Sequence, residues 1–322
     1  MVRGWLAGVL TLLAAAAAAY ETDQFSNRAA PIEDATGVLN ARVNSTLRTI
    51  AQNWDGPRDE ARFVNAVFHE IGGHHWVDRL ERWAMKSDQV QTLPTGRWDS
   101  VYHQVPFWST RVASVFGVGP TIKLNGVLIG SDKIGHFLSQ GRKFWFRWKR
   151  YDDEARAAER SAMTERQIFG RLTTGIYSNA DLVANYEGYR FYRSLFEDGV
   201  VPGKPAILAW NGGHWVQQRE FDWADHVNAY WDEALNINHY DRILYPKMRE
   251  QLLDLCSEYH QAPALWTIDD EVALQRRYAH LQLEDTRELR LDQLCSAGNG
   301  AENGSSDRAR DTRVAAGAPA PG

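Results

Sequence analysis

The sequence predicts a mainly α-helical protein, built as a single multi-helix domain with one small β-hairpin at about residues 121–130. Apolar residues recur at helical spacing from Val38 to Ile50, a pattern typical of an amphipathic helix. Asn125 and Gly126 stand between two apolar tetrads, and this pattern favours a tight two-residue hairpin turn. The length of 322 residues does not require a second domain.

Most of the remaining segments combine helical spacing with recognisable ends. Ser131 and Asp132 follow the hairpin directly, and we expect them to cap the next helix. Gly72-Gly73 interrupts one helical stretch and Gly175 ends another. The expected helices cover residues 38–50, 58–85, 102–116, 132–148, 154–173, 179–196, 221–236, 242–259 and a stretch between 269 and 294, with a turn at 210–215.

The composition excludes one class of partner. The chain is 44% hydrophobic and 24% charged, which is ordinary for a globular protein. Its net charge of -5 argues against nucleic-acid binding, because no basic surplus is available to neutralise phosphates. The basic stretch Arg142–Arg150 is followed at once by acidic residues, and we interpret it as a solvated helix face. We therefore expect no nucleic-acid partner.

The beginning of the chain has the pattern of a secretory signal peptide. Arg3 supplies a positive charge, Leu6–Leu13 an apolar core, and the following alanines a cleavage site after Ala19. An uncleaved anchor is the alternative, because the apolar run is nearly long enough to span a bilayer. We expect cleavage, a periplasmic or secreted location, and no transmembrane span in the mature protein.

These boundaries give a signal peptide over 1–19, a helical domain over 20–295 and a disordered tail over 296–322. The tail is rich in Gly, Ala and polar residues, which cannot form a core. Cys256 and Cys295 are the only cysteines, and an oxidising compartment favours a disulfide between them. Two unpaired thiols are the alternative.

Three stretches place Asp, Asn and His side chains on one helical stripe in segments that are otherwise apolar and aromatic. A carboxylate is costly to bury without a partner. Such stripes therefore indicate either a shared functional site or a structural polar network. The stretches are 131–137, 178–188 and 222–233.

In the first stretch, Asp132 and His136 lie four residues apart and share one helix face. A carboxylate one turn from an imidazole can orient it, which suits a general base or a metal ligand. The alternative is an N-cap Asp bonded to a His at the edge of the core. Gly135 costs helix stability at this position, which indicates close approach by another group.

The segment Asp132-Lys133-Ile134-Gly135-His136-Phe137 resembles the Asp-Lys-x-x-His-Phe helix of bacterial VanZ-like membrane proteins and of some small envelope lipoproteins. The resemblance covers six residues. It implies that this motif is one used in proteins of the cell envelope.

The second stretch places Asp181 and Asn185 one helical turn apart. Asp and Asn are poor residues for a helix interior, because their side chains compete for backbone groups. The pair therefore predicts either a cap with a polar network, or ligands for a substrate or cation. Glu187 faces elsewhere, and both an ion pair with Arg190 and a binding role remain open for it.

The third stretch repeats this pattern on the expected helix 221–236. Asp222 and His226 have the carboxylate–histidine spacing of the first stretch. A solvated helix face is the alternative. The polar stripe consists of Asp225, Asn228 and Asp232.

One further motif fails on its geometry. His69 and His74 flank a segment that resembles a zinc-protease helix, but they are five residues apart and the motif requires four. Paired glycines also break the helix between them, so we reject this class, although Glu70 and His74 keep a spacing that suits a polar centre. The sequence has no Walker loop, no dinucleotide-binding glycine pattern and no Gly-x-Ser-x-Gly elbow.

Together these patterns favour an exported cell-envelope hydrolase that acts on an envelope polymer or a lipid headgroup. Metal-assisted hydrolysis with a divalent metal ion and a two-carboxylate glycosidase mechanism both remain open. The predicted site residues are His136, Asp132, Asp181 and Asp232 for catalysis, Asn185, Asn228 and Glu187 for substrate binding, and Asp225 and His226 for a divalent metal.

Two non-catalytic interpretations compete with the hydrolase. In the first, the polar stripes form a satisfied network in an envelope scaffold and fix the packing of its helices. In the second, some of the thirteen tryptophans line a groove that binds a glycan or a lipid headgroup. The sequence leaves enzyme and non-enzyme open.

Overall fold

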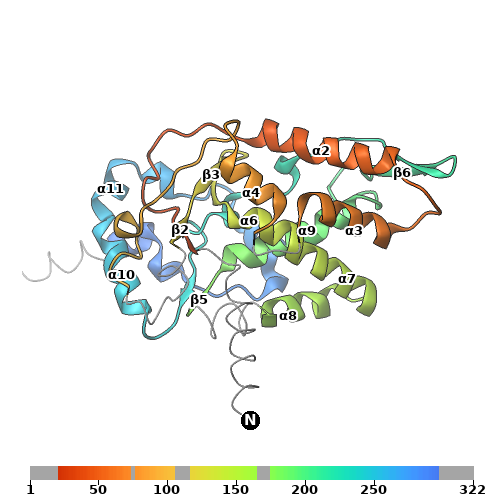
Figure 1. The fold of residues 1–322 in the computed structure, drawn as a ribbon. Coiled ribbons are helices and arrows are strands. Elements are labelled where there is room, and N and C mark those ends of the chain that lie inside the picture. The colour runs from red at the N-terminus through yellow and green to blue at the C-terminus, as the bar shows by residue number, and fades with distance from the viewer. Residues whose placement is uncertain (1–20, 74–76, 106–116, 165–174, 297–322) are drawn as a thin grey trace, which may run out of the picture.

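The computed structural model describes residues 21–73, 77–105, 117–164 and 175–296. Helices dominate these ranges and the strands form only short pairs, which confirms the prediction of a mainly α-helical domain (Figure 1). The predicted signal peptide, residues 106–116 and 165–173 of two expected helices, His74 and residues 297–322 lie outside the described residues.

The helices largely follow the predicted spacing of apolar residues. The expected stretch 58–85 forms two helices on either side of Gly72-Gly73. Figure 1 shows α10 and α11 at one end of the molecule and α7 towards the other. The helices are α2 (Thr36–Gln52), α3 (Glu60–Ile71), α4 (Arg79–Lys86), α6 (Asp132–Gly135), α7 (Gly141–Tyr151), α8 (Glu154–Thr164), α9 (Asn179–Ser194), α10 (Tyr245–Asp254), α11 (Cys256–Gln261) and α12 (Glu271–Tyr278).

The strands form four two-stranded pairs within the described ranges. The predicted hairpin is confirmed, with Asn125 and Gly126 both at positive φ, as a type I′ turn requires. The expected turn at 210–215 is also the tip of a second hairpin, where Gly212 and Gly213 adopt positive φ. The pairs are β1 (Glu21–Thr22) with β2 (Val118–Gly119), β3 (Thr121–Leu124) with β4 (Val127–Gly130), β5 (Ile176–Tyr177) with β8 (His239–Tyr240), and β6 (Leu208–Asn211) with β7 (His214–Gln217).

The prediction of one helix over 221–236 is wrong. The segment instead contains two single 3-10 turns, η5 (Trp223–Asp225) and η6 (Ala229–Trp231). The Asp222 carboxylate accepts from the backbone N–H of Ala224, and the Asn228 side chain accepts from that of Tyr230. Short polar side chains that bond nearby backbone groups favour such turns over a continuous helix.

Two other expectations differ from the structure in detail. The side chain of Ser131 makes no capping hydrogen bond, because the chain enters α6 with helical dihedral angles already at this residue. The last expected helix is shorter than predicted, since α12 ends at Tyr278 and 3-10 turns follow it. By contrast, Ser178 is the N-cap of α9, and its hydroxyl accepts from the backbone N–H of Asp181.

A continuous helical rod leads from α6 into α7 through a π-helical turn, η3 (His136–Gln140). The π-helical turn is a rare widening of the α-helix and is frequent at functional sites. Here it begins at His136 itself. The Tyr192 hydroxyl of α9 donates a 3.0 Å hydrogen bond to the Leu138 carbonyl within this turn, which ties the rod to α9.

Two glycines allow the rod and α9 to pack backbone against backbone. A Cβ atom on Gly141 would lie 2.5 Å from the Gly188 carbonyl carbon, and one on Gly188 would overlap the Phe137 carbonyl group. Phe137 of the rod stacks on Phe191 of α9 at 5.2 Å between ring centroids. This close approach sets the distance between the first and second polar stretches.

Gly188→Ala is therefore expected to destabilise the protein and to separate the two helices. Overpacking typically costs about 1–3 kcal/mol, and a backbone overlap belongs to the upper part of that range. Urea unfolding measures the change. Gly37→Ala in α2 is the matched control, because a Cβ atom there meets nothing within 4 Å and alanine favours the helix. Equal stability of the two variants would contradict the packing argument.

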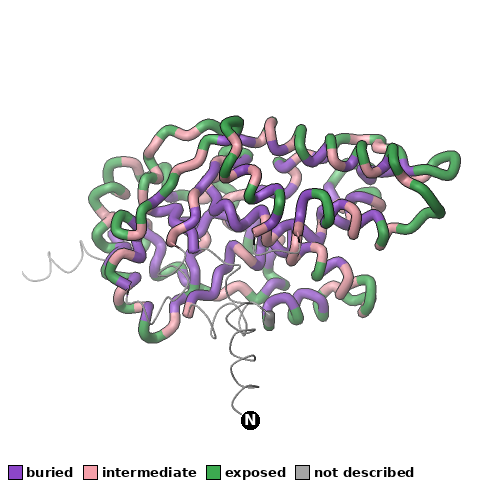
Figure 2. Tube along the Cα trace, viewed as in Figure 1, coloured by how far each residue is buried: buried purple, intermediate pink, exposed green. Residues whose placement is uncertain are grey.

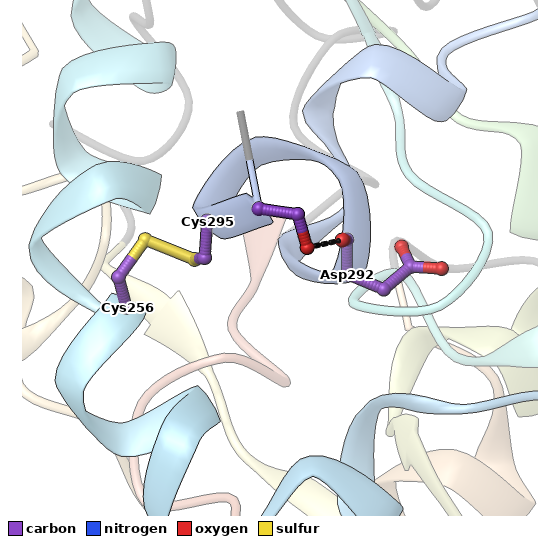
Figure 3. Close-up of a disulfide and its surroundings, with 4 residues drawn as sticks. Cys256, Asp292 and Cys295 are labelled. Carbon is purple, nitrogen blue, oxygen red and sulfur yellow. Dashed lines mark hydrogen bonds between the residues drawn. A yellow bond between two sulfur atoms is a disulfide. The ribbon is translucent and has the colours of Figure 1, made fainter. Parts of the chain in front are cut away.

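The interior consists of two main apolar clusters. The larger surrounds the rod and α9, and the smaller joins Phe25 to α10 and the C-terminal segment. Figure 2 shows the buried residues concentrated along the middle of the molecule. The predicted disulfide between Cys256 and Cys295 is confirmed, and it fastens α11 to that segment (Figure 3). Within the described ranges, no helix has the length and apolarity that crossing a membrane requires.

Candidate functional site

Lys133 lies at the centre of a buried group of carboxylates. Its ammonium donates to Asp132 Oδ2 at 2.8 Å and to Glu233 Oε1 at 2.7 Å, and it pairs with Asp181 Oδ1 at 2.6 Å. Only 1% of the Lys133 side chain is exposed. Burial disfavours the ammonium, but the three carboxylates outweigh that cost and hold the pKa of Lys133 well above its usual range.

His136 meets Asp181 across the contact between the rod and α9. The His136 Nε2 atom lies 3.3 Å from Asp181 Oδ2, and His136 Nδ1 lies 3.1 Å from Asn185 Oδ1. Burial alone would raise the pKa of Asp181, yet the charges of His136 and Lys133 prevail and lower it. Asp181 is thus an ionised carboxylate with one oxygen on Lys133 and the other facing the imidazole.

The hydrogen bond to Asn185 determines which imidazole nitrogen is available for chemistry. Because a carbonyl oxygen accepts, His136 Nδ1 is the nitrogen that carries the proton. In the neutral ring, the Nε2 lone pair then faces the Asp181 oxygen. Two lone pairs at 3.3 Å require a positive group between them, either a proton on the ring or an atom bound from outside.

Asp132 completes a potential ligand set with this pair. Ligand atoms of Asp132, His136 and Asp181 all lie within 4.8 Å of one another. While Asp132 Oδ2 binds Lys133, Asp132 Oδ1 accepts a long 3.4 Å hydrogen bond from the Thr22 hydroxyl of β1. One oxygen of each carboxylate is therefore held by Lys133, which leaves the second oxygen directed elsewhere.

Four more buried acids surround this set: Glu21, Asp78, Glu81 and Glu233. Burial raises the pKa of each, and for Asp78 the value is about 7. The neighbouring carboxylates raise it further for Glu21, Glu81 and Glu233. Acid groups with such pKa values are common at functional sites, because catalysis needs protons that move near neutral pH.

Glu81 also explains the glycine within the motif. A Cβ atom on Gly135 would lie 2.5 Å from Glu81 Oε2, so the absence of a side chain lets this carboxyl approach the rod. Ser139 of the π-helical turn binds Asp78, with its hydroxyl 2.6 and 2.7 Å from the two carboxyl oxygens. Residues of α4 and the segment before it thus form one wall of the centre.

Exposure differs across the centre. The side chains of His136 and Asp181 are 11% and 16% exposed, whereas Lys133 and Glu233 are almost completely enclosed. The carboxylate–imidazole pair is therefore the part that solvent reaches, and Lys133 with Glu233 forms the support behind it. Such an arrangement can bind and polarise a small polar molecule at the exposed side.

Four of the predicted site residues meet at this centre: Asp132, His136, Asp181 and Asn185. We use the term polar centre for these four residues together with Lys133 and Glu233. The four predicted residues come from the first two polar stretches. The remaining predicted residues lie in other environments.

Glu187, predicted to bind substrate, belongs to a separate and completely buried network. Its carboxylate accepts from the Tyr278 hydroxyl at 2.9 Å, and it pairs with Arg190, Arg277 and His226 Nδ1. Burial would raise the pKa of Glu187, but the His226 hydrogen bond and the two arginines lower it to about 2. Because Glu187 has no exposed surface, its contacts stabilise the fold and its carboxylate does not face solvent.

Asp225 and His226, predicted to bind a metal, engage different partners. Asp225 pairs with Lys204 and Arg219, while His226 is buried among aromatic rings, including a stacked Phe221. Burial lowers the pKa of His226 and so favours the neutral ring. The two side chains do not converge, because Asp225 pairs with Lys204 and Arg219 whereas His226 faces Glu187.

Asp232 and Asn228 also lie outside the polar centre. Asp232 forms a buried ion pair with Arg28 at 2.8 Å. Asn228 donates to the Tyr278 hydroxyl and caps η6, which places it beside the Glu187 network. Both side chains are thus occupied by bonds that stabilise the fold. The third stretch contributes Glu233 to the polar centre instead of the residues predicted from it.

The described tryptophans mostly fill the core or pack against it. Trp145, Trp223 and Trp231 are fully buried, and Trp215 and Trp266 are nearly so. Four more are partly buried and pack against the core, namely Trp54, Trp83, Trp148 and Trp210, whereas 75% of the surface of Trp98 is exposed. The fully buried tryptophans therefore do not line a groove.

Sequence reasoning missed Lys133, Glu233 and the acids on β1 and α4. Lys133 carried a signal, because it stands between Asp132 and apolar Ile134 on a segment that is otherwise buried. A lysine at such a position requires anionic partners. Comparisons with protein-family models, with curated proteins and with solved structures find no match for the chain.

Proposed function

We propose that the protein is an exported hydrolase of the cell envelope in which the His136–Asp181 pair activates a water molecule. The observation that supports this most directly is the 3.3 Å approach of His136 Nε2 to Asp181 Oδ2 on the exposed side of the polar centre. When the imidazole is neutral, both atoms present lone pairs to the same point. That point can hold either a hydrogen of a water molecule or a cation to which a water molecule is bound.

Each neighbouring residue has a role in this proposal. Asn185 holds the imidazole by Nδ1, so that Nε2 faces outward. Lys133 fixes Asp181 and Asp132 through one oxygen each. In hydrolysis, the pair takes a proton from the water, and the water oxygen bonds to the electrophilic atom of an ester, amide, phosphodiester or glycosidic bond. The bond to the leaving group then breaks, and the leaving group takes up a proton.

The location in the envelope has separate support. The first nineteen residues have the pattern of a secretory signal, and the chain pairs its only two cysteines. Disulfides persist in oxidising compartments such as the periplasm. The expected substrates are accordingly a polymer of the envelope or a lipid headgroup.

The test uses the mature protein on two envelope substrates. Purified peptidoglycan sacculi and vesicles of phosphatidylethanolamine with phosphatidylglycerol are incubated with the protein, and released products are measured by mass spectrometry. His136→Ala is expected to lower the rate of release by about 10²–10⁴-fold, the usual contribution of such a group. His239→Ala is the control, because this exposed histidine lies in β8 and is expected to leave the rate unchanged.

A non-catalytic scaffold is the second candidate, and the enclosure of Lys133 with its three carboxylates supports it. Buried networks of this kind can fix helix packing without any chemistry. Equal release by the wild-type protein and His136→Ala, including none by either, would favour the scaffold and reject the hydrolase.

A further inference from the structure

We propose that Asp132, His136 and Asp181 bind a divalent cation, Zn²⁺ or Mn²⁺, at the exposed side of the polar centre. The role of the cation as carrier of the attacking water rests on the proposed function. Its binding is a separate claim, which depends only on the positions of these side chains.

The spacing of the ligand atoms fits one ion. Two ligands that each lie about 2.0–2.2 Å from a metal are about 3–3.5 Å apart at tetrahedral or octahedral angles. The 3.3 Å between His136 Nε2 and Asp181 Oδ2 falls in this range. An Asp132 oxygen lies within 4.8 Å of both, so a small side-chain rotation brings it to the same ion.

The hydrogen bonds behind the ligands are those of a metal site. A ligand histidine usually donates its second ring N–H to a carbonyl or carboxylate oxygen, and Asn185 Oδ1 accepts from His136 Nδ1 here. Lys133 holds one oxygen of Asp132 and one oxygen of Asp181. His136 and Asp181 are therefore oriented before any ion arrives.

The charge around the ligands also favours a cation. Asp132, Asp181 and Glu233 share the single ammonium of Lys133. Although Glu233 is buried, its Oε2 atom has no hydrogen-bond partner in the described part of the chain. An unpaired carboxylate oxygen in such surroundings is costly, and a second positive charge nearby would reduce that cost.

The mixed ligand set indicates which cation to expect. Ca²⁺ takes six to eight oxygen ligands and Mg²⁺ prefers oxygen with retained waters, so an imidazole disfavours both. Zn²⁺ accepts imidazole with carboxylate, and three protein ligands leave a position for water. Mn²⁺ tolerates the same mixture at larger coordination number.

The experiment measures binding without reference to activity. Mature protein is treated with a chelator, dialysed against Zn²⁺ or Mn²⁺, and its bound metal is counted by elemental analysis. About one equivalent is expected for the wild-type protein. His136→Ala and Asp181→Asn are each expected to weaken binding at least about tenfold, and the exposed His239→Ala serves as the control. Circular dichroism establishes that each variant is folded.

Melting temperature gives a second readout on the wild-type protein alone, because an ion that binds only the folded state raises it. Zn²⁺ or Mn²⁺ should raise it, and Ca²⁺ at the same concentration should not. The inference is overturned if the wild-type protein retains no metal, or if folded His136→Ala retains as much. Loss of envelope hydrolysis in His136→Ala without metal binding by the wild-type protein would reject the cation and leave the hydrolase standing.

Discussion

Lys133→Met is expected to lower the free energy of unfolding at pH 7 by about 3–5 kcal/mol, because it removes one partner of a buried ion cluster. Methionine matches the length of the side chain but leaves Asp132, Asp181 and Glu233 without the ammonium that each contacts within 2.8 Å. Three uncompensated carboxyl groups then remain in a nearly water-free environment. Urea unfolding followed by circular dichroism measures the loss.

Lys86→Met provides the matched control for this change. Lys86 is the exposed last residue of α4, and surface substitutions of this kind usually change stability by less than about 0.5 kcal/mol. A Lys133→Met protein as stable as Lys86→Met would show that the carboxyl groups do not depend on the ammonium, and the polar centre would then need a different account.

Glu187→Gln is expected to cost about 3 kcal/mol at pH 7, as the depression of the Glu187 pKa to about 2 implies. The folded-state pKa lies below the unfolded value of 4.5. The stabilisation is therefore complete above pH 4.5 and is lost as the pH falls towards 2. Because glutamine does not ionise, the stability gap between the two proteins should narrow across this window.

The pH dependence separates this explanation from a simple packing defect. A gap that stays constant from pH 7 to pH 2.5 would contradict the assigned role of the Glu187 charge. Glu197→Gln is the control, since its ion pair with Arg193 is partly exposed and such pairs contribute about 0–1 kcal/mol. Unfolding curves at several pH values measure both variants.

The parts of the fold that depend on neighbouring residues could be predicted from the sequence. The Asn125-Gly126 turn follows from the backbone angles that these residues tolerate, and the Ser178 cap follows from its hydroxyl. The pairing of His136 with Asp181 followed from two helical stripes that needed buried partners. For the turn and the cap, the deciding interaction lies within a few residues of the pattern, whereas His136 and Asp181 are far apart in the sequence and meet only in the fold.

The features that the sequence did not predict depend on local hydrogen bonds that compete with a helix, or on contacts between residues far apart in the chain. At 221–236, apolar spacing predicted a helix, but Asp222 and Asn228 bind local backbone groups and make 3-10 turns instead. Glu233 lies 100 residues from the Lys133 ammonium that it contacts, and no local spacing encodes that pairing. The ends of short helices are likewise decided by contacts made elsewhere.

The polar centre draws on the rod, α9 and the residue after Asp232, and residues of β1 and α4 surround it, so these groups are spread over most of the described chain. Thr22, for example, donates a hydrogen bond to Asp132, which lies 110 positions later in the chain. A nascent or truncated polypeptide therefore lacks the complete set of groups until its later segments have emerged and docked. Any ligand retained here would report that the whole domain has assembled, and its release on heating should coincide with global unfolding.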